Sequence, residues 1–209
     1  MGVELITTDG IFSLDGEDFE VTNNIWIVGD DTEVVVIDAA HDAQKIVDAV
    51  AGRKVRQIVL THGHNDHINA AGALADAVDA PISLHPDDTM LWQVVYPERS
   101  VDIDLAEGDV IRVAGHELGV LHTPGHAPGC CCFHDVASGV LYSGDTLFCG
   151  GPGATGRSYS DRPTILRTIR ERLLTLPDET VVHTGHGDST TIGGERALIE
   201  ELVRTELGE

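Results

Sequence analysis

Residues 55–67 read VRQIVLTHGHNDH, so a run of strand-forming side chains leads directly into a cluster of side chains that can bind metal. The β-branched run at 55–60 predicts a buried strand. His62 and His64 follow the carboxyl end of this strand. Side chains two positions apart in an extended chain point the same way, so these two imidazoles can share one metal ion.

Asp66 and His67 add a carboxylate and a third imidazole to the same segment. They are adjacent, so they reach another direction if the chain turns at Asn65, as asparagine favours. Neutral imidazole nitrogens and carboxylate oxygens are the ligands that Zn²⁺ and Fe²⁺ accept. The segment therefore predicts ligands for two neighbouring ions. The alternative is a polar turn that is rich in histidine by chance.

The composition restricts the class of partner. The 209-residue chain carries 35 acidic and 13 basic residues, which gives a formal net charge of -22. Nucleic acids and anionic membranes are bound through basic patches, so neither is an expected partner. The length suffices for a sizeable core, and we expect a single domain over residues 1–209.

Several features indicate a cytoplasmic location. The longest purely aliphatic run, residues 34–37, is too short to cross a bilayer, and the acidic N-terminus lacks the regions of a secretory signal. Three consecutive cysteines cannot form ordinary disulfides with one another, so we expect buried thiols in a strand and a reducing compartment. The cysteines are Cys130, Cys131, Cys132 and Cys149.

Strands and helices are expected to alternate in the first half of the chain, as in layered α/β proteins. The expected strands there are residues 21–28, 33–38, 55–60 and 81–85, and the expected helices are 43–50, 68–78 and 86–95. The second half has shorter strands, expected at 110–113, 117–122, 130–133, 140–142 and 180–183, with helices at 162–174 and 195–207. This weak two-fold pattern predicts two βα halves packed sheet against sheet.

Three further polar residues, His126, Asp145 and His186, each follow a short apolar run and lie beside glycine. Glycine lets the backbone approach a crowded centre closely. Together with residues 62–67, these three complete two coordination sets. Asp38 ends another aliphatic strand, and its spacing leaves two roles open: it caps the following helix, or it orients metal-binding histidines.

The motif Thr-His-x-His-x-Asp-His at residues 61–67, followed by a histidine, an aspartate and a histidine after glycine turns, resembles the metallo-β-lactamase superfamily over residues 3–192. The resemblance implies an αββα sandwich, in which two mixed β-sheets are flanked by helices and the site lies at one edge between the sheets. It also implies the ligand assignment. The first ion would be bound by His62, His64 and His126, the second by Asp66, His67 and His186, and Asp145 would bridge both.

Within that superfamily the chain resembles the hydroxyacylglutathione hydrolases (glyoxalase II), which hydrolyse thioesters. The antibiotic-hydrolysing members lack an aspartate at the position of Asp145. The resemblance implies two divalent ions, zinc first, although the same ligands accept iron and manganese. A hydroxide held between the ions would attack the substrate, directed by the catalytic carboxylates of Asp66 and Asp145. Asp38 matches the family's strand-end aspartate, which favours its role in supporting the histidines.

One helix's length of chain follows His186, whereas those enzymes carry a longer helical extension that contributes to glutathione binding. The expected substrate is therefore a thioester of a small thiol, with glutathione, another thiol, or another ester or lactone left open. Arg157 and Tyr159, in the loop after Asp145, are the expected substrate contacts. A homodimer is also left open.

Two other classes of protein are weighed against hydrolysis. Persulfide dioxygenases also resemble the chain and would bind one Fe²⁺ through His62, His126 and Asp145. Their loop reads Gly-Arg-Thr-Asp, whereas residues 156–161 read GRSYSD, and this difference disfavours them. The intact ligand set disfavours a metal-stabilised binding protein without activity. The glycine-rich segment 150–157 lacks the Lys-Ser/Thr ending of a phosphate-binding loop, so it predicts a loop that flanks the active site.

Overall fold

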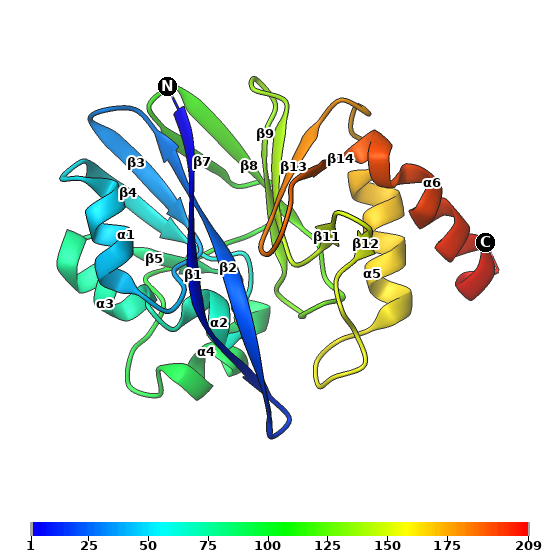
Figure 1. Cartoon of the computed structure of the whole chain (residues 1–209), viewed down its shortest axis with the longest axis horizontal. Coiled ribbons are helices and arrows are strands. Elements are labelled where there is room, and N and C mark those ends of the chain that lie inside the picture. Colours follow the sequence, from blue (N-terminus) through cyan, green and yellow to red (C-terminus); the bar gives the residue numbers. More distant parts are fainter. Residues whose placement is uncertain (1, 209) are drawn as a thin grey trace.

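Two six-stranded sheets pack face to face and carry helices on their outer faces in the computed structural model, which describes residues 2–208 (Figure 1). The first sheet has the strand order β1-β2-β3-β4-β5-β6, and the second has the order β14-β13-β10-β9-β8-β7. Each sheet contains both parallel and antiparallel pairs. The αββα sandwich of two mixed sheets expected from the sequence is therefore confirmed.

The first sheet is built from residues 2–104, with helices on its outer face. Its strands are β1 (Gly2–Leu14), β2 (Glu17–Gly29), β3 (Glu33–Ile37), β4 (Lys54–Val59), β5 (Ile82–Leu84) and β6 (Ile103–Asp104). The helices of this half are α1 (Ala43–Val50), α2 (Asn65–Ile68), α3 (Ala71–Val78), the 3₁₀ turn η1 (Pro86–Asp88) and α4 (Thr89–Val95).

The second sheet is built from residues 110–191 and is covered by helices from the C-terminal third of the chain. Its strands are β7 (Val110–Val113), β8 (His116–His122), β9 (Cys131–Asp135), β10 (Val140–Gly144), β13 (Val181–Thr184) and β14 (Thr190–Thr191), with a small separate ribbon of β11 (Leu147–Phe148) and β12 (Gly151–Pro152). Its helices are α5 (Arg162–Thr168), which continues as η2 (Ile169–Leu173), and α6 (Ile192–Leu202), which continues as η3 (Val203–Leu207).

Strand β3 shows why the sheets stack in this way. Val34 and Val36 pack into the cluster beneath α1 and α3, whereas Val35 and Ile37 pack into the cluster between the two sheets. Side chains alternate between the two faces of a strand, so an uninterrupted aliphatic run is buried on both faces. Full burial of each such side chain contributes roughly 1.5–3 kcal/mol. The apolar run at 34–37 thus places β3 at the centre of the first half.

The N-terminal hairpin is longer than the sequence predicted. β1 and β2 pair over thirteen residues each, and the strand expected at 21–28 begins at Glu17. Asp15 and Gly16 join them with φ values of 57° and 78°. Two consecutive residues with positive φ form the type I′ turn that suits a tight hairpin. The turn therefore extends the pairing through segments whose exposed side chains show little apolar periodicity.

Two helix boundaries also differ from expectation. The helix expected at 68–78 is divided into α2 and α3, and α2 begins at Asn65, within the histidine cluster rather than after it. The terminal helix begins at Ile192 instead of residue 195, because the Thr191 side chain accepts a hydrogen bond from the backbone of Gly194. Such a side-chain cap sets the first residue of a helix.

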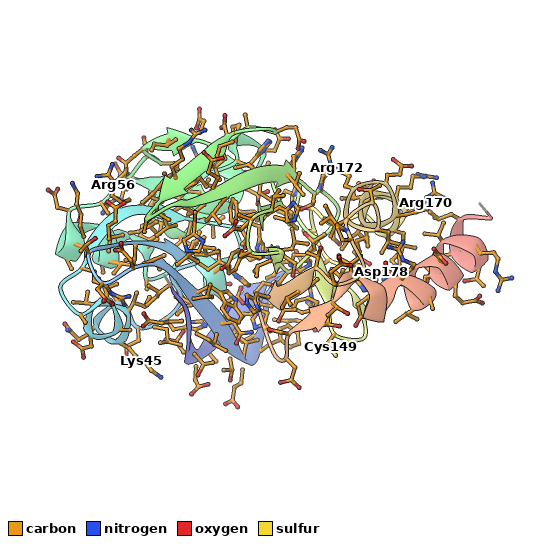
Figure 2. All side chains as sticks on the ribbon, turned by 90° about the horizontal axis from the view of Figure 1, so that it is seen from above. Lys45, Arg56, Cys149, Arg170, Arg172 and Asp178 are labelled. Atoms are coloured by element: carbon orange, nitrogen blue, oxygen red, sulfur yellow. The ribbon has the colours of Figure 1, made fainter. Side chains whose placement is uncertain are left out.

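The surface carries the charge, as a view from above shows (Figure 2). Lys45, Arg56 and Arg172 lie at the periphery of the molecule, where Lys45 and Arg56 are exposed and Arg172 is half-buried. Cys149 is also exposed, whereas the three consecutive cysteines are buried, and all four are free thiols. Within residues 2–208, no helix is long and apolar enough to cross a membrane.

Candidate metal centre

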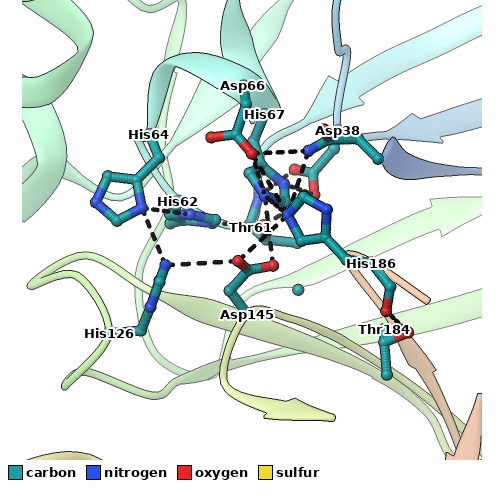
Figure 3. Close-up of polar contacts among 12 residues, drawn as sticks. Asp38, Thr61, His62, His64, Asp66, His67, His126, Asp145, Thr184 and His186 are labelled. Carbon is teal, nitrogen blue, oxygen red and sulfur yellow. Dashed lines mark hydrogen bonds and ion pairs between the residues drawn. The ribbon is translucent and has the colours of Figure 1, made fainter. Parts of the chain in front are cut away.

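The predicted ligands meet at one edge of the sandwich, between the two sheets (Figure 3). The segment 62–67 follows β4, whereas Asp145 follows β10 and His186 follows β13. His126 lies in the connection between β8 and β9. Side chains that follow neighbouring strand ends gather at one edge of a layered fold. The repeated order of strand, glycine turn and ligand therefore brings distant residues together.

The first group of candidate ligands consists of three buried imidazoles, His62, His64 and His126. His64 Nδ1 lies 3.0 Å from His62 Nε2 and 3.0 Å from His126 Nε2. His62 and His64 thus point to a common centre, as their spacing of two residues predicts.

The second group consists of Asp66, His67 and His186. His67 Nε2 lies 3.1 Å from His186 Nε2, and Asp66 Oδ2 lies 3.4 Å from His186 Nε2. Asp66 and His67 belong to α2, so the turn expected at Asn65 is the first residue of a short helix. This helix directs both side chains toward His186.

Asp145 lies between the two groups. Its Oδ1 is 3.3 Å from His67 Nε2, and its Oδ2 is 3.5 Å from both His126 Nε2 and His186 Nε2. A single carboxylate therefore faces ligand atoms from both sets, which is the placement that a bridging ligand requires.

Two observations show that these residues fit a pair of divalent cations. Asp66 Oδ1 and Asp145 Oδ1 are buried without a hydrogen-bond partner among the described residues, and an unpaired buried polar atom is costly. The imidazole nitrogens within each group also have suitable spacing, since nitrogens bound to a tetrahedral zinc ion lie about 3.3 Å apart.

Four of the imidazoles are fixed by their outer nitrogens. His67 Nδ1 donates to Asp38 Oδ2 at 2.8 Å, and His62 Nδ1 lies 3.0 Å from Thr61 Oγ1, which in turn donates to Asp38. His126 and His186 are held in the same manner by backbone carbonyl oxygens. A carboxylate or a carbonyl can only accept, and the hydroxyl of Thr61 already donates its proton to Asp38, so these contacts keep a proton on Nδ1 and make Nε2 the nitrogen that can bind a metal.

Asp38 therefore has the orienting position rather than the capping one. Besides His67, it accepts hydrogen bonds from the backbone and the hydroxyl of Thr61, at 2.8 Å and 2.9 Å. The side chain that caps α1 is Asp42, which accepts from Lys45 N. Of the two roles that the sequence left open, the structure supports the second.

Sequence reasoning missed three other supports of the site. Asn23 Nδ2 donates to Asp66 Oδ2 at 3.0 Å. The carbonyl of Thr22 accepts from His186 Nδ1, and the carbonyl of Ala154 accepts from His126 Nδ1, each at 2.8 Å. The available signal for Asn23 was the polar run at residues 22–24, which is buried at Asn23 and Asn24 and precedes the apolar end of β2, whereas a backbone carbonyl leaves no trace in residue type.

The electrostatics divide the histidines into two kinds. Burial lowers the pKa of His62 well below its usual range and lowers the pKa of His64 to about 3, so both rings are neutral at neutral pH. Burial acts in the same direction on His67 and His186, but nearby carboxylates, with Asp145 foremost, outweigh it. They raise the pKa of His67 well above its usual range and that of His186 to about 10.

These pKa shifts predict that metal binding releases protons. A group with a raised pKa is protonated below that pKa, so His186 carries a proton at neutral pH and must lose it to become a ligand. The apparent zinc affinity should therefore fall by about tenfold per pH unit for each released proton as the pH drops from about 8 to 6. Calorimetric titrations in buffers of different ionisation enthalpy measure the release. An affinity that is independent of pH would contradict the prediction.

A cleft of 390 Å³ opens onto the centre. Its walls combine the ligands His64, Asp66, His126, Asp145 and His186 with Phe12, Val21, Thr22, Phe148 and Ala154. Ala154 belongs to the glycine-rich segment, which therefore flanks the site as predicted. The apolar side chains come from the hairpin and from β11.

Neither predicted substrate contact lies on the walls of this cleft. Arg157 Nη1 is 2.8 Å from Glu17 Oε2, and its guanidinium lies 4.3 Å from the centre of the Phe19 ring. Tyr159 is 54% exposed. The hairpin, which is longer than the sequence predicted, supplies the acidic and aromatic partners of Arg157.

Comparison with known proteins agrees with the geometry. The family model of the metallo-beta-lactamase superfamily matches residues 19–186. The chain belongs to this superfamily. Among its members, an uncharacterized protein of Aquifex aeolicus is 40% identical over 190 residues, which cover 84% of this chain and 89% of the relative.

Two other members bear on chemistry. The chain is 31% identical to the hydroxyacylglutathione hydrolase GloC of Haemophilus influenzae over 188 residues, which cover 82% of this chain and 87% of the relative. It is also similar to the solved structure of TTHA1623 in a di-iron-bound form, with a TM-score of 0.75 and 34% identity, over 84% of this chain and 93% of the other. Superfamily membership and the histidine–aspartate groups together indicate a metal-dependent hydrolase.

Proposed function

We propose that this protein hydrolyses a thioester of a small thiol at a centre of two divalent ions, with His62, His64 and His126 as ligands of one ion and Asp66, His67 and His186 as ligands of the other. The position of Asp145 between the two groups carries the proposal. The similarity to a hydroxyacylglutathione hydrolase supports the thioester as the bond that is cleaved.

The bound ions would lower the pKa of water and polarise the substrate carbonyl, so that a nucleophile forms near neutral pH. The residues of the chain then direct the reaction. The carboxylates of Asp66 and Asp145, which face the nitrogens that would bind the ions, would also accept a hydrogen bond from the attacking water and aim it. The leaving thiol ionises near pKa 8.5, so it departs as a thiolate without a dedicated acid.

We propose zinc as the native metal, with iron or manganese as alternatives. Imidazole and carboxylate ligands accept all three, so the ligand set does not discriminate among them. The similar structure with two iron ions favours keeping iron as a candidate. Metal analysis of the purified protein decides the matter.

The test pairs two measurements on the same preparation. Plasma mass spectrometry gives the metal content, and thioester cleavage is followed with S-lactoylglutathione and with simpler acyl thioesters. About two ions per chain together with turnover are the expected result for a site of this kind. A single iron ion with no hydrolysis, and with oxygen consumption on glutathione persulfide, would replace the proposal with a dioxygenase.

A further inference from the structure

We propose that Asp88 is a positioning residue for the first metal site: it joins the loop that carries His62 and His64 to the loop that carries His126. The three imidazoles are thereby arranged before an ion binds. The inference rests on the metal binding that the proposed function requires, and it is independent of which ester is cleaved.

The carboxylate of Asp88 gives one oxygen to each loop. The backbone N–H of Gly63 donates to Asp88 Oδ2 at 2.8 Å, and the backbone N–H of Gly129 donates to Asp88 Oδ1 at 2.6 Å. Gly63 lies between His62 and His64, and Gly129 lies three residues after His126. One side chain thus fixes the separation of the two segments whose imidazole nitrogens stand 3.0 Å apart.

Both glycines are needed for this approach. A Cβ atom at Gly129 would lie 2.7 Å from Asp88 Cγ, and a Cβ atom at Gly63 would lie 2.8 Å from Leu91 Cβ and 3.0 Å from Asp88 Cβ. Contacts this short are incompatible with a side chain. The chain therefore leaves both positions without one, and the carboxylate meets the two backbones directly.

Asp88 is buried, with no exposed surface, so its contacts are not weakened by water. Burial raises the pKa of its carboxyl group to about 6, while the two backbone donors act in the opposite direction. Hydrogen bonds to an ionised carboxylate are about twice as strong as those between neutral groups. The carboxylate of Asp88 is therefore held in place by the backbone N–H groups of the two loops that it joins.

The element that carries Asp88 is itself anchored. Asp88 ends η1, where its own N–H donates to the carbonyl of His85. Leu91, in the first turn of α4, packs with Ala127 and Cys130, which belong to the loop that carries His126. The aspartate is therefore presented from a fixed helix start rather than from a mobile loop.

The test compares Asp88→Asn with Asp135→Asn. The first variant keeps the size of the side chain but turns one acceptor into an amide donor that faces a backbone N–H. The second alters another buried aspartate, which contacts His116 and bonds to neither loop. Zinc affinity is measured by chelator competition, and Co²⁺ absorption spectra report the ligand geometry of each site.

We expect Asp88→Asn to weaken one of the two zinc sites by about 10- to 100-fold and to alter one component of the Co²⁺ spectrum, because supporting residues of metal ligands have effects of this size. Asp135→Asn should keep the zinc affinity and the Co²⁺ spectrum of the unaltered protein. Two zinc ions bound by Asp88→Asn with unchanged affinity and spectrum would overturn the inference. If the protein binds two ions but cleaves no thioester, the proposed function fails while this test still stands.

A measurement on the unaltered protein covers the case in which Asp88→Asn does not fold. In the metal-free protein, the amide protons of Gly63 and Gly129 should exchange slowly with solvent, because both are bonded to the buried carboxylate. Rapid exchange of either amide, at a temperature where β4 and β9 remain protected, would show that Asp88 does not join the loops before metal binds.

Discussion

Asparagine in place of Asp145 is expected to abolish measurable hydrolysis and to reduce the tightly bound metal from two ions to one. The carboxylate stands within 3.5 Å of imidazole nitrogens in both groups, so its loss removes a shared charge and one oxygen ligand. Interactions of a catalytic metal supply several kcal/mol, so kcat/KM should fall by at least about 10³-fold. Thioester turnover at saturating zinc and metal content by mass spectrometry measure both effects.

Asp135→Asn is the matched control for that variant. Asp135 is also buried and also contacts a histidine, with Oδ2 at 2.6 Å from His116 Nδ1, but it lies in β9 and outside the metal-binding groups. It should lower stability without changing the number of bound ions. Full activity or two bound ions in Asp145→Asn would refute the bridging role.

Alanine in place of Asp38 is expected to weaken metal binding by about 10- to 100-fold and to lower the free energy of unfolding by at least about 2 kcal/mol. Three donors lose their acceptor at once: the backbone and hydroxyl of Thr61 and the Nδ1 of His67. His67 would then be free to rotate or to change tautomer. Chelator competition and urea denaturation of the metal-free protein separate the two losses.

Asp42→Ala is the control that distinguishes helix capping from support of the metal ligands, the two possible roles of Asp38. Asp42 caps α1, so its loss should cost about 1 kcal/mol of stability and leave zinc affinity unchanged. Equal zinc affinities for Asp38→Ala and the unaltered protein would show that Asp38 serves the fold alone.

The sequence was sufficient to predict the layered architecture, because β3 contains a short aliphatic run that is buried on both faces and because strands alternate with helices in the first half of the chain. It was also sufficient to bring together the predicted ligands, since four of them lie within residues 62–67 and the other three each follow a strand and a glycine. The order of residues along the chain is enough to predict a site when most of its ligands lie in one short motif.

The remaining features depend on contacts between distant backbones, which residue types do not reveal. The carbonyl oxygens that hold His126 and His186 could belong to any residue. In the sequence, Asp88 is an acidic residue at the start of an expected helix. Only the structure places its carboxylate between two glycine amides. Arg157, the expected substrate contact, pairs with Glu17 of a hairpin that is longer than the sequence predicted.

Each ion at this centre would be shared by segments that the ribosome makes at very different times. Residues 62–67 are synthesised first, His126 and Asp145 later, and His186 is the last of the ligands. A nascent chain that ends before His126 therefore carries four of the ligands but completes neither set. A centre that holds both ions requires strands from β4 in the first sheet to β13 in the second, so it can form only after both sheets have been made.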